Sequence, residues 1–292
     1  MSENNTRILG LIQQTRGKNM NQNLESSVQA IRKLADQGAQ IVCLQELFQS
    51  QYFCQTEDSN KFKLAETIPG PSTEILSKLT VELGLVLIVP LFEKRAEGIY
   101  HNTAVVIDAD GSIAGCYRKM HIPDDPCFYE KFYFTPGDIG FKSFPTRYGR
   151  VGVLLCWDQW FPEAARLTAL AGAQFIFYPT AIGYQEGDAQ ELNKQSSAWE
   201  TVQKAHAISN GVFVATTNRV GREDALTFWG RSFICDPFGE IIVQASGNHS
   251  ENLIAECDLS KIEQVRQSWP FFRDRRIDAY QNLSRIYDDP IT

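Results

Sequence analysis

Short apolar strands alternate with amphipathic helices along most of this chain of 292 residues. One order of elements occurs twice: a strand, a helix, the tripeptide Gly-Ala-Gln and a second apolar strand. The tripeptide begins at Gly38 in the first copy and at Gly172 in the second. Strands connected through helices form β-α-β units, in which the helices cover the face of a sheet. The repeat therefore predicts an α/β fold of two similar halves that face each other, with helices outside.

A hairpin signal indicates that the predicted sheets are mixed rather than purely parallel. Asp110-Gly111 separates the apolar runs 102–108 and 113–119, and Asp-Gly between two such runs favours a tight antiparallel turn. No linker-like stretch divides the chain into independent parts. We therefore predict a single domain over residues 1–292.

Composition and charge narrow the classes of function. Hydrophobic residues make up 43% and charged residues 22% of the chain, as in ordinary globular proteins. The net charge of −7 argues against nucleic acid or an anionic membrane as the main partner, and no apolar run approaches the length of a membrane span. The seven cysteines lack metal-type spacing, and four histidines leave few candidates for a metal site. Unpaired thiols and an N-terminus without a signal-peptide pattern predict a cytoplasmic protein.

Three side chains that could do chemistry stand where predicted apolar strands end. Glu46 follows one strand, Lys119 closes a second, and Cys156 closes a third, just before a helix. Taken singly, a lone cysteine is more often a buried structural residue, and a strand-end glutamate or lysine is more often a surface charge. Catalytic groups of α/β folds gather at strand ends, however. A nucleophile, a base and a cation at three such ends favour an active site.

These three groups support one kind of reaction. A thiolate attacks an sp² carbon, while a carboxylate takes the thiol proton and later protonates the leaving amine. An ammonium group and a backbone N–H stabilise the oxyanion that develops on the substrate. The set needs no histidine, so it predicts a cysteine-dependent hydrolase of carbon–nitrogen bonds.

At this point the residues resemble a family. The chain is similar to the nitrilase/amidase superfamily of carbon–nitrogen hydrolases in three motifs that occur in the expected order, and the similarity spans nearly the whole chain. It implies a four-layer α-β-β-α sandwich with mixed sheets, a Glu-Lys-Cys catalytic set, no metal and no organic cofactor. The motifs are Glu46, Tyr117-Arg118-Lys119-Met120-His121, and Gly152-x-x-x-Cys156-Trp157-Asp158-x-x-Phe161-Pro162-Glu163.

The resemblance also implies a role for each residue of the site. Glu46 is expected to be the general base, Lys119 the oxyanion stabiliser and Cys156 the nucleophile. The backbone N–H of Trp157 is expected to be the second oxyanion donor. Glu130 lies in an aromatic-rich segment and matches an additional glutamate that orients the site in many members; the alternative is a loop carboxylate paired with the neighbouring lysine.

Substrate preference has to be deduced from the residues around the site. Similar hydrolases of carbamoyl amino acids place arginines just after the nucleophile to hold a carboxylate, but this chain has Gln159 and Trp160 there. Acidic residues in two loops, Asp124-Asp125 and Glu186 with Asp188, could instead bind an alkylammonium group. Glu186 is the preferred candidate, Asp124 the second, and Asp125 and Asp188 are expected to be solvated loop charges. Tyr52, Tyr129 and Trp157 are candidates for aromatic walls around a polymethylene chain.

We therefore expect a small cationic ureido compound as substrate, within the hydrolases of carbamoyl amines. One alternative is a sister hydrolase that acts on N-carbamoyl-β-alanine, a carbamoyl amino acid or an aliphatic amide. A second is a binding or scaffold protein without activity, although the intact catalytic set argues against it. The tail from about residue 269 to 292 is rich in charged and aromatic residues, and the resemblance implies that it packs on a neighbouring subunit of a homo-oligomer.

Overall fold

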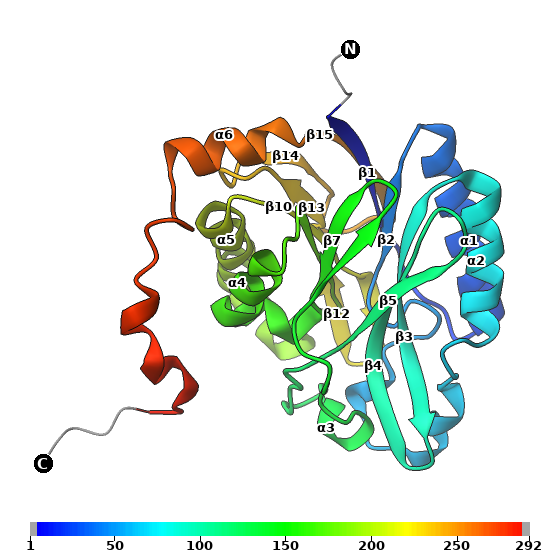
Figure 1. Ribbon diagram of the computed structural model, residues 1–292. Helices are drawn as coiled ribbons and strands as arrows, with labels where there is room; N and C mark the ends of the chain where they lie inside the picture. Colours follow the sequence, from blue (N-terminus) through cyan, green and yellow to red (C-terminus); the bar gives the residue numbers. More distant parts are fainter. Residues whose placement is uncertain (1–4, 288–292) are drawn as a thin grey trace, which may run out of the picture.

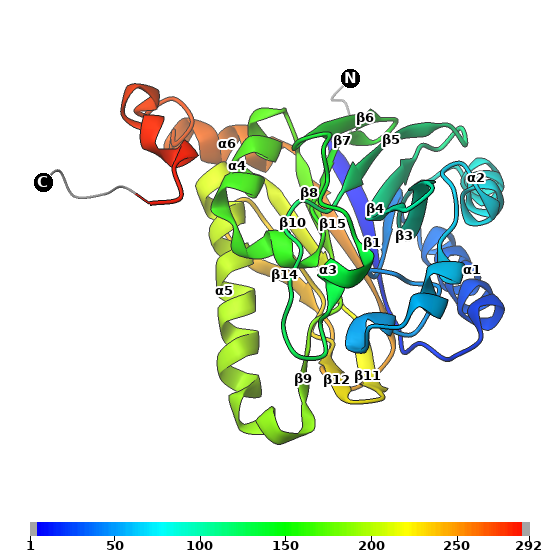
Figure 2. The same cartoon turned by 90° about the horizontal axis from the view of Figure 1, so that it is seen from below.

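Two mixed β-sheets face each other at the centre of the molecule, and helices cover their outer faces (Figures 1 and 2). The structure is a computed structural model that describes residues 5–287. Its layers follow the order helix, sheet, sheet, helix. This arrangement confirms the expected four-layer α-β-β-α sandwich with mixed sheets.

The first sheet has the strand order β15-β1-β2-β3-β4-β5. Its centre is parallel, because β1 pairs parallel with β2 and β2 with β3, whereas β15, β4 and β5 add antiparallel pairs. The predicted hairpin around Asp110-Gly111 is the β4–β5 connection. The strands are β1 (Thr6–Gln13), β2 (Ile41–Leu44), β3 (Val86–Ala96), β4 (Ile99–Ile107), β5 (Ile113–Arg118) and β15 (Glu251–Asp258).

The second sheet has the order β14-β13-β10-β8-β7-β6, and its three central strands are again parallel. A smaller antiparallel sheet, β11-β12-β9, lies beside the two large ones. The strands are β6 (Ser143–Thr146), β7 (Gly149–Val153), β8 (Phe175–Pro179), β9 (Gly183–Gln185), β10 (Phe213–Thr217), β11 (Val220–Glu223), β12 (Leu226–Trp229), β13 (Phe233–Cys235) and β14 (Ile241–Gln244).

Helices α1 (Met20–Asp36) and α2 (Pro71–Leu83) cover the first sheet, and α4 (Pro162–Leu170) and α5 (Leu192–Asn210) cover the second (Figure 2). The start of α1 is stabilised because the side chain of Asn19 accepts the backbone N–H groups of the first turn. Both α2 and α4 begin with proline, which suits the first helical position.

Strand β2 shows how the sandwich core is built. Ile41 and Cys43 belong to the cluster between the two sheets, whereas Val42 and Leu44 pack with the side chains of α1 and α2. All four are buried, as expected for a central parallel strand with apolar neighbours on both faces. The polar residues that follow β2 therefore emerge at the end of a rigid strand.

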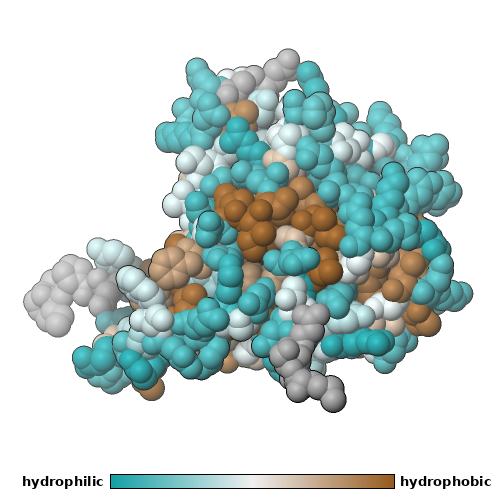
Figure 3. Space-filling view, turned by 90° about the horizontal axis from the view of Figure 1, so that it is seen from above, coloured by the Kyte–Doolittle hydropathy of each residue, from teal (hydrophilic) through white to brown (hydrophobic). Residues whose placement is uncertain are grey.

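The surface and the C-terminal segment complete the architecture. Figure 3 shows an apolar patch amid polar side chains on the face seen from above. After α6 (Ser260–Ser268), the chain extends away from the sandwich through two short 3₁₀ helices (Figure 1). Residues 288–292 of the predicted tail lie outside the described part of the chain. No helix within residues 5–287 has the length and apolar character needed to cross a membrane.

Candidate active site

Three strand ends bring the predicted catalytic residues together. Glu46 follows β2 and Lys119 follows β5 of the first sheet, whereas Cys156 follows β7 of the second. All three are buried, with exposed fractions of 0% for Glu46 and Lys119 and 5% for Cys156. The ammonium group of Lys119 donates to Glu46 Oε1 at 2.9 Å and to Glu130 Oε2 at 2.6 Å. Glu130 therefore pairs with this buried lysine rather than with Lys131.

One oxygen of Glu46 is committed to hydrogen bonds and the other is not. Oε1 also accepts from Asn102 Nδ2 at 2.7 Å, which fixes the carboxylate from a second direction. No hydrogen-bond partner for Oε2 is found among residues 5–287, although this atom is buried. A buried carboxylate oxygen without a partner retains the capacity to accept a proton.

Burial and mutual charge set the protonation of the site. Burial lowers the pKa of Lys119, but attraction to Glu130, Glu46 and Cys156 outweighs it and holds that pKa well above its ordinary value. The same burial, reinforced by Glu46, raises the pKa of the Cys156 thiol well above its usual range, although Lys119 opposes the shift. At neutral pH the lysine is thus charged and the resting thiol keeps its proton. The thiol therefore needs a base to become a nucleophile.

Burial also raises the pKa of Glu130, to about 7, against the opposing effect of Lys119. Its Oε1 accepts a hydrogen bond from the Tyr52 hydroxyl at 2.7 Å. Tyr52 is buried and does not line the cavity beside Cys156, so the structure places it behind Glu130 rather than as an aromatic wall. Its ring packs against Phe128 and Phe228 instead.

Cys156 occupies a strained turn between strand and helix. Its φ of +40° is unusual for a residue with a side chain, and it begins the 3₁₀ helix η3 (Cys156–Trp160). Asp158 holds the turn, because Oδ2 accepts from the backbone N–H of Leu155 at 2.9 Å and from the Tyr117 hydroxyl at 2.8 Å. Its other oxygen accepts from the backbone N–H of His121 at 3.0 Å. We had predicted no role for Asp158, although it lies in the motif that follows the nucleophile.

A cavity of about 450 Å³ opens beside Cys156 and Glu130. Its wall combines aromatic and aliphatic side chains with a few polar and charged ones, as suits a small organic ligand with an apolar middle. Trp157 lines it, as predicted, although its role in binding remains a prediction. The aromatic lining residues are Phe128, Trp157, Trp160, Tyr184 and Trp229.

The acidic residues proposed for the distal end of the cavity are placed unevenly. Asp125, which was expected to be a solvated charge, lines the cavity, whereas Asp124, the second candidate for binding the ammonium group, is exposed and is not among the lining residues. The reason is local: the turn from Asp125 to Phe128 closes through a backbone hydrogen bond and brings Asp125 to the wall. Glu186 begins the 3₁₀ helix η4 (Glu186–Glu191) after β9, and its side chain lies outside the described structure, as does that of Asp188.

Among the described side chains, which exclude those of Glu186 and Asp188, no group of three or more histidine, cysteine, aspartate or glutamate residues is arranged to hold a metal ion. All seven cysteines fall within residues 5–287 and all are free thiols.

Comparison with known proteins agrees with this geometry. The model of the carbon–nitrogen hydrolase family matches residues 8–267, so this chain belongs to that family. It is 44% identical to the N-carbamoylputrescine amidase of Oryza sativa subsp. japonica over 90% of this chain and 89% of that protein. It is 39% identical to a citrullinase of Francisella tularensis, with 96% and 98% covered. A crystal structure of a carbon–nitrogen hydrolase from Helicobacter pylori G27 matches with a TM-score of 0.93 and 47% identity, over 97% of this chain and 100% of that one.

Proposed function

We propose that this protein is a cysteine-dependent amidohydrolase that converts N-carbamoylputrescine to putrescine, carbon dioxide and ammonia. The observation that carries the chemistry is the buried Lys119, held between Glu46 and Glu130 beside the thiol of Cys156. The substrate is proposed from the relatives of 43–44% identity that are named N-carbamoylputrescine amidase.

In the first half-reaction, Glu46 takes the proton of the Cys156 thiol through its unpartnered oxygen, and the thiolate attacks the ureido carbon. The oxyanion of the tetrahedral intermediate is stabilised by the ammonium group of Lys119 and the backbone N–H of Trp157. The bond from carbon to the terminal nitrogen then breaks. Glu46 returns the proton to the leaving nitrogen, ammonia departs, and a carbamoyl thioester remains on sulfur.

In the second half-reaction, Glu46 removes a proton from water, and the resulting hydroxide attacks the thioester carbon. The same two donors stabilise the second oxyanion, the carbon–sulfur bond breaks, and Glu46 returns the proton it took from water to the leaving thiolate, which regenerates the thiol and the ionised carboxylate. The product is the carbamate of putrescine, which loses carbon dioxide to leave the free amine. Glu130 contributes by holding Lys119 in place through a second ion pair.

The cavity fits a substrate with an apolar middle and a cationic end. Aromatic side chains enclose the space next to Cys156, and Asp125 offers a carboxylate at its wall. Gln159 is buried, and its carbonyl accepts from the Trp199 indole at 2.8 Å, so it presents no cation to a substrate carboxylate. Lys194 also lines the cavity, but its ammonium group is paired with Glu191 at 3.2 Å. The preference for an ammonium group over a carboxylate at the far end of the ligand is therefore proposed from Asp125 and from the named relatives.

Putrescine is a polyamine, so we place the reaction in polyamine synthesis by the route through agmatine. Seven free thiols support a reducing compartment, and we propose the cytoplasm. We further propose that the protein acts as a homo-oligomer, without a metal or an organic cofactor.

A substrate panel tests the proposal. Ammonia release should be measured with N-carbamoylputrescine, citrulline, N-carbamoyl-β-alanine and an aliphatic amide, and we expect the highest kcat/KM for the first. Citrulline is the informative comparison, because it carries the same ureido group with an α-amino acid at the far end. Faster turnover of the carboxylate-bearing ureides would contradict the proposed substrate.

A second measurement separates an enzyme from an inactive scaffold. Mass spectrometry of the quenched reaction should detect an adduct on Cys156 with the mass of the substrate less ammonia, and Cys156→Ala should abolish it. Iodoacetamide should label Cys156 stoichiometrically. An inert thiol without an adduct would contradict the proposed chemistry and favour a scaffold.

A further inference from the structure

We propose that the buried ion pair between Arg219 and Glu223 positions the catalytic carboxylates Glu46 and Glu130. Arg219 lies directly before β11 and Glu223 ends it, in the small third sheet. Both side chains are buried, and Arg219 Nη1 donates to Glu223 at 2.9 Å. Neither residue touches the cavity beside Cys156, so both act through other residues.

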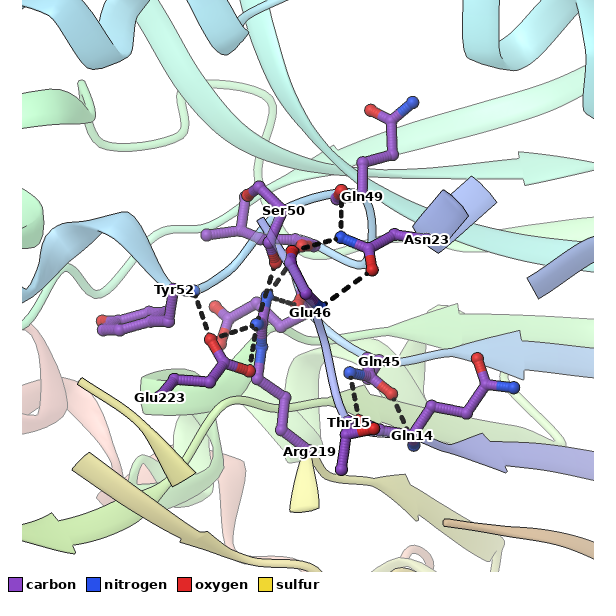
Figure 4. Close-up of polar contacts among 12 residues, drawn as sticks. Gln14, Thr15, Asn23, Gln45, Glu46, Gln49, Ser50, Tyr52, Arg219 and Glu223 are labelled. Atoms are coloured by element: carbon purple, nitrogen blue, oxygen red, sulfur yellow. Dashed lines mark hydrogen bonds and ion pairs between the residues drawn. The ribbon is translucent and has the colours of Figure 1, made fainter. Parts of the chain in front are cut away.

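Arg219 fixes the backbone of the loop that carries Glu46. Its Nη2 donates to the carbonyl oxygens of Glu46 at 2.9 Å and Leu47 at 2.7 Å, and its Nη1 donates to that of Ser50 at 3.0 Å (Figure 4). The loop needs this support, because Leu47 adopts a φ of +50°, which is unfavourable for a residue with a branched side chain. A planar guanidinium can bind several oxygens at once, whereas a lysine ammonium acts as a single point.

Glu223 fixes the other end of the same loop. Its Oε2 accepts the backbone N–H of Tyr52 at 2.6 Å (Figure 4), and its backbone carbonyl accepts from Gln55 Nε2 at 3.0 Å. Tyr52 in turn donates its hydroxyl to Glu130. The position of Glu223 is therefore transmitted to the second carboxylate through one intervening residue.

The contacts close into a ring. From Arg219 the ring passes through the Glu46 backbone to its side chain, then to Lys119 and Glu130, and returns through Tyr52 and Glu223. A displacement of the Arg219–Glu223 ion pair is therefore transmitted to Glu46 and Glu130, the two carboxylates that bind Lys119.

The cost of burial supports a positioning role over a purely stabilising one. Removing two charges from water costs several kcal/mol per ion, and apolar side chains of similar volume often serve stability as well or better. Apolar side chains could not bind three carbonyl groups and one N–H of the loop. These hydrogen bonds therefore indicate that the Arg219–Glu223 pair serves to orient the loop that carries Glu46 and Tyr52.

Glu223→Gln tests the inference with little change in shape. The amide has to direct an NH₂ group at either the Arg219 guanidinium or the Tyr52 N–H, so one donor meets another. We expect kcat to fall at least tenfold, while KM stays within threefold. The matched control is Asp236→Asn. Asp236 is another buried carboxylate, which lies in the β13–β14 turn and pairs with Lys261 of α6. We expect the control to keep wild-type kcat.

Alkylation of Cys156 by iodoacetamide in the absence of substrate supplies the decisive readout. If Glu223 acts through Glu46, then Glu223→Gln and Glu46→Gln should each slow alkylation, and the double variant should be no slower than Glu46→Gln within twofold. If the double variant's alkylation rate were instead reduced by the product of the two single reductions, Glu223 would act independently of the base, and the inference would be overturned. So would a Glu223→Gln protein with wild-type kcat and alkylation rate.

The inference rests on the proposed cysteine chemistry, but the two fail in different ways. An inert Cys156 in the wild-type chain would overturn the proposed function and this inference with it. A reactive wild-type Cys156 that is unaffected by Glu223→Gln would overturn this inference alone. If Glu223→Gln does not fold, Arg219→Lys is measured in the same way, with the same expectations. Failure of both variants to fold would show that the pair serves stability and would overturn the positioning role.

Discussion

At the residue scale, the site depends on one buried lysine that is shared by two carboxylates. An isolated ammonium group would be costly to bury, but Lys119 has an anion on each side and keeps its charge. The shared cation also holds Glu46 and Glu130 in fixed places relative to the thiol. Substitutions of these groups should therefore lower activity, and those that leave a buried charge without its partner should also lower stability.

Glu46→Gln tests the base directly. Glutamine keeps the volume of the side chain and an oxygen for Lys119 and Asn102, but it cannot accept the thiol proton. We expect kcat to fall by at least about a hundredfold, as for loss of a general base. Ammonia release measures the rate, and far-UV circular dichroism checks the fold. Activity within tenfold of wild type would show that Glu46 is not the base.

Tyr52→Phe tests the second carboxylate through its pH dependence. Burial raises the pKa of Glu130 to about 7, and the hydrogen bond from Tyr52 opposes the rise. Loss of this bond should raise the pKa further. Because ionised Glu130 holds Lys119, activity should increase with pH through this pKa, and the increase should move to higher pH in the variant. At pH 7 we expect a roughly three- to tenfold loss of kcat that alkaline pH restores.

The pH profile of kcat is the measurement for Tyr52→Phe. Tyr148→Phe is the matched control, because it removes a hydroxyl that donates to the backbone of Gly84, away from the site. A profile of Tyr52→Phe that coincides with those of wild type and control would exclude this role of Glu130.

At the element scale, the turn from β7 to η3 places the nucleophile. Asp158→Asn should destabilise this turn. In the native chain the Asp158 carboxylate accepts hydrogen bonds from several donors, and the amide of asparagine would place an NH₂ group against one or more of them. We expect a loss of about 3 kcal/mol in the free energy of unfolding. Tyr117→Phe is the control, because it removes only one of these hydrogen bonds and should cost less. Urea denaturation measures both, and equal losses would contradict a central role of Asp158.

Elements with strong local signals could be predicted from the sequence. The two repeated units with helices α1 and α4 could be recognised from apolar strands and the Gly-Ala-Gln stops. Helix α2 begins at Pro71 after Gly70, and Ser72 lies in its first turn. The short strands β6, β9, β11 and β12 were not predicted, because three or four residues carry too little periodicity, and the longer strand β15 was missed as well.

The candidate site could be predicted in part, because its main residues follow apolar strands that carry a strong local signal. Glu46, Lys119 and Cys156 each end an apolar strand, so their convergence follows from the topology. Tyr52 was expected in the cavity wall but lies behind Glu130, because side-chain direction in a loop has no period to reveal it. The Arg219–Glu223 pair left no local signal either, since its partners lie about 170 positions away in the chain.

At the scale of the whole molecule, the C-terminal tail leaves apolar side chains without cover. Phe272 anchors its beginning, with the guanidinium groups of Arg166 and Arg266 at 5.1 Å and 4.5 Å from the ring. Beyond this anchor, Ile277 and Leu283 are 71% and 66% exposed and Ile286 is fully exposed. Several large apolar side chains exposed within one short segment favour a contact site on that segment. We therefore propose that the tail packs on a second copy of the chain.

Substitution of these tail residues tests the proposed assembly in the full-length chain. Serine at Ile277, Leu283 and Ile286 together should weaken association and lower the mass measured by sedimentation velocity. The protomer should keep its melting transition, because these side chains are exposed within one chain. The matched control is Ile75→Ser with Val81→Ser, which removes exposed aliphatic groups from α2 on the far side of the sandwich (Figure 2). Equal masses for the tail variant, the control and the wild type would contradict a role of the tail in assembly.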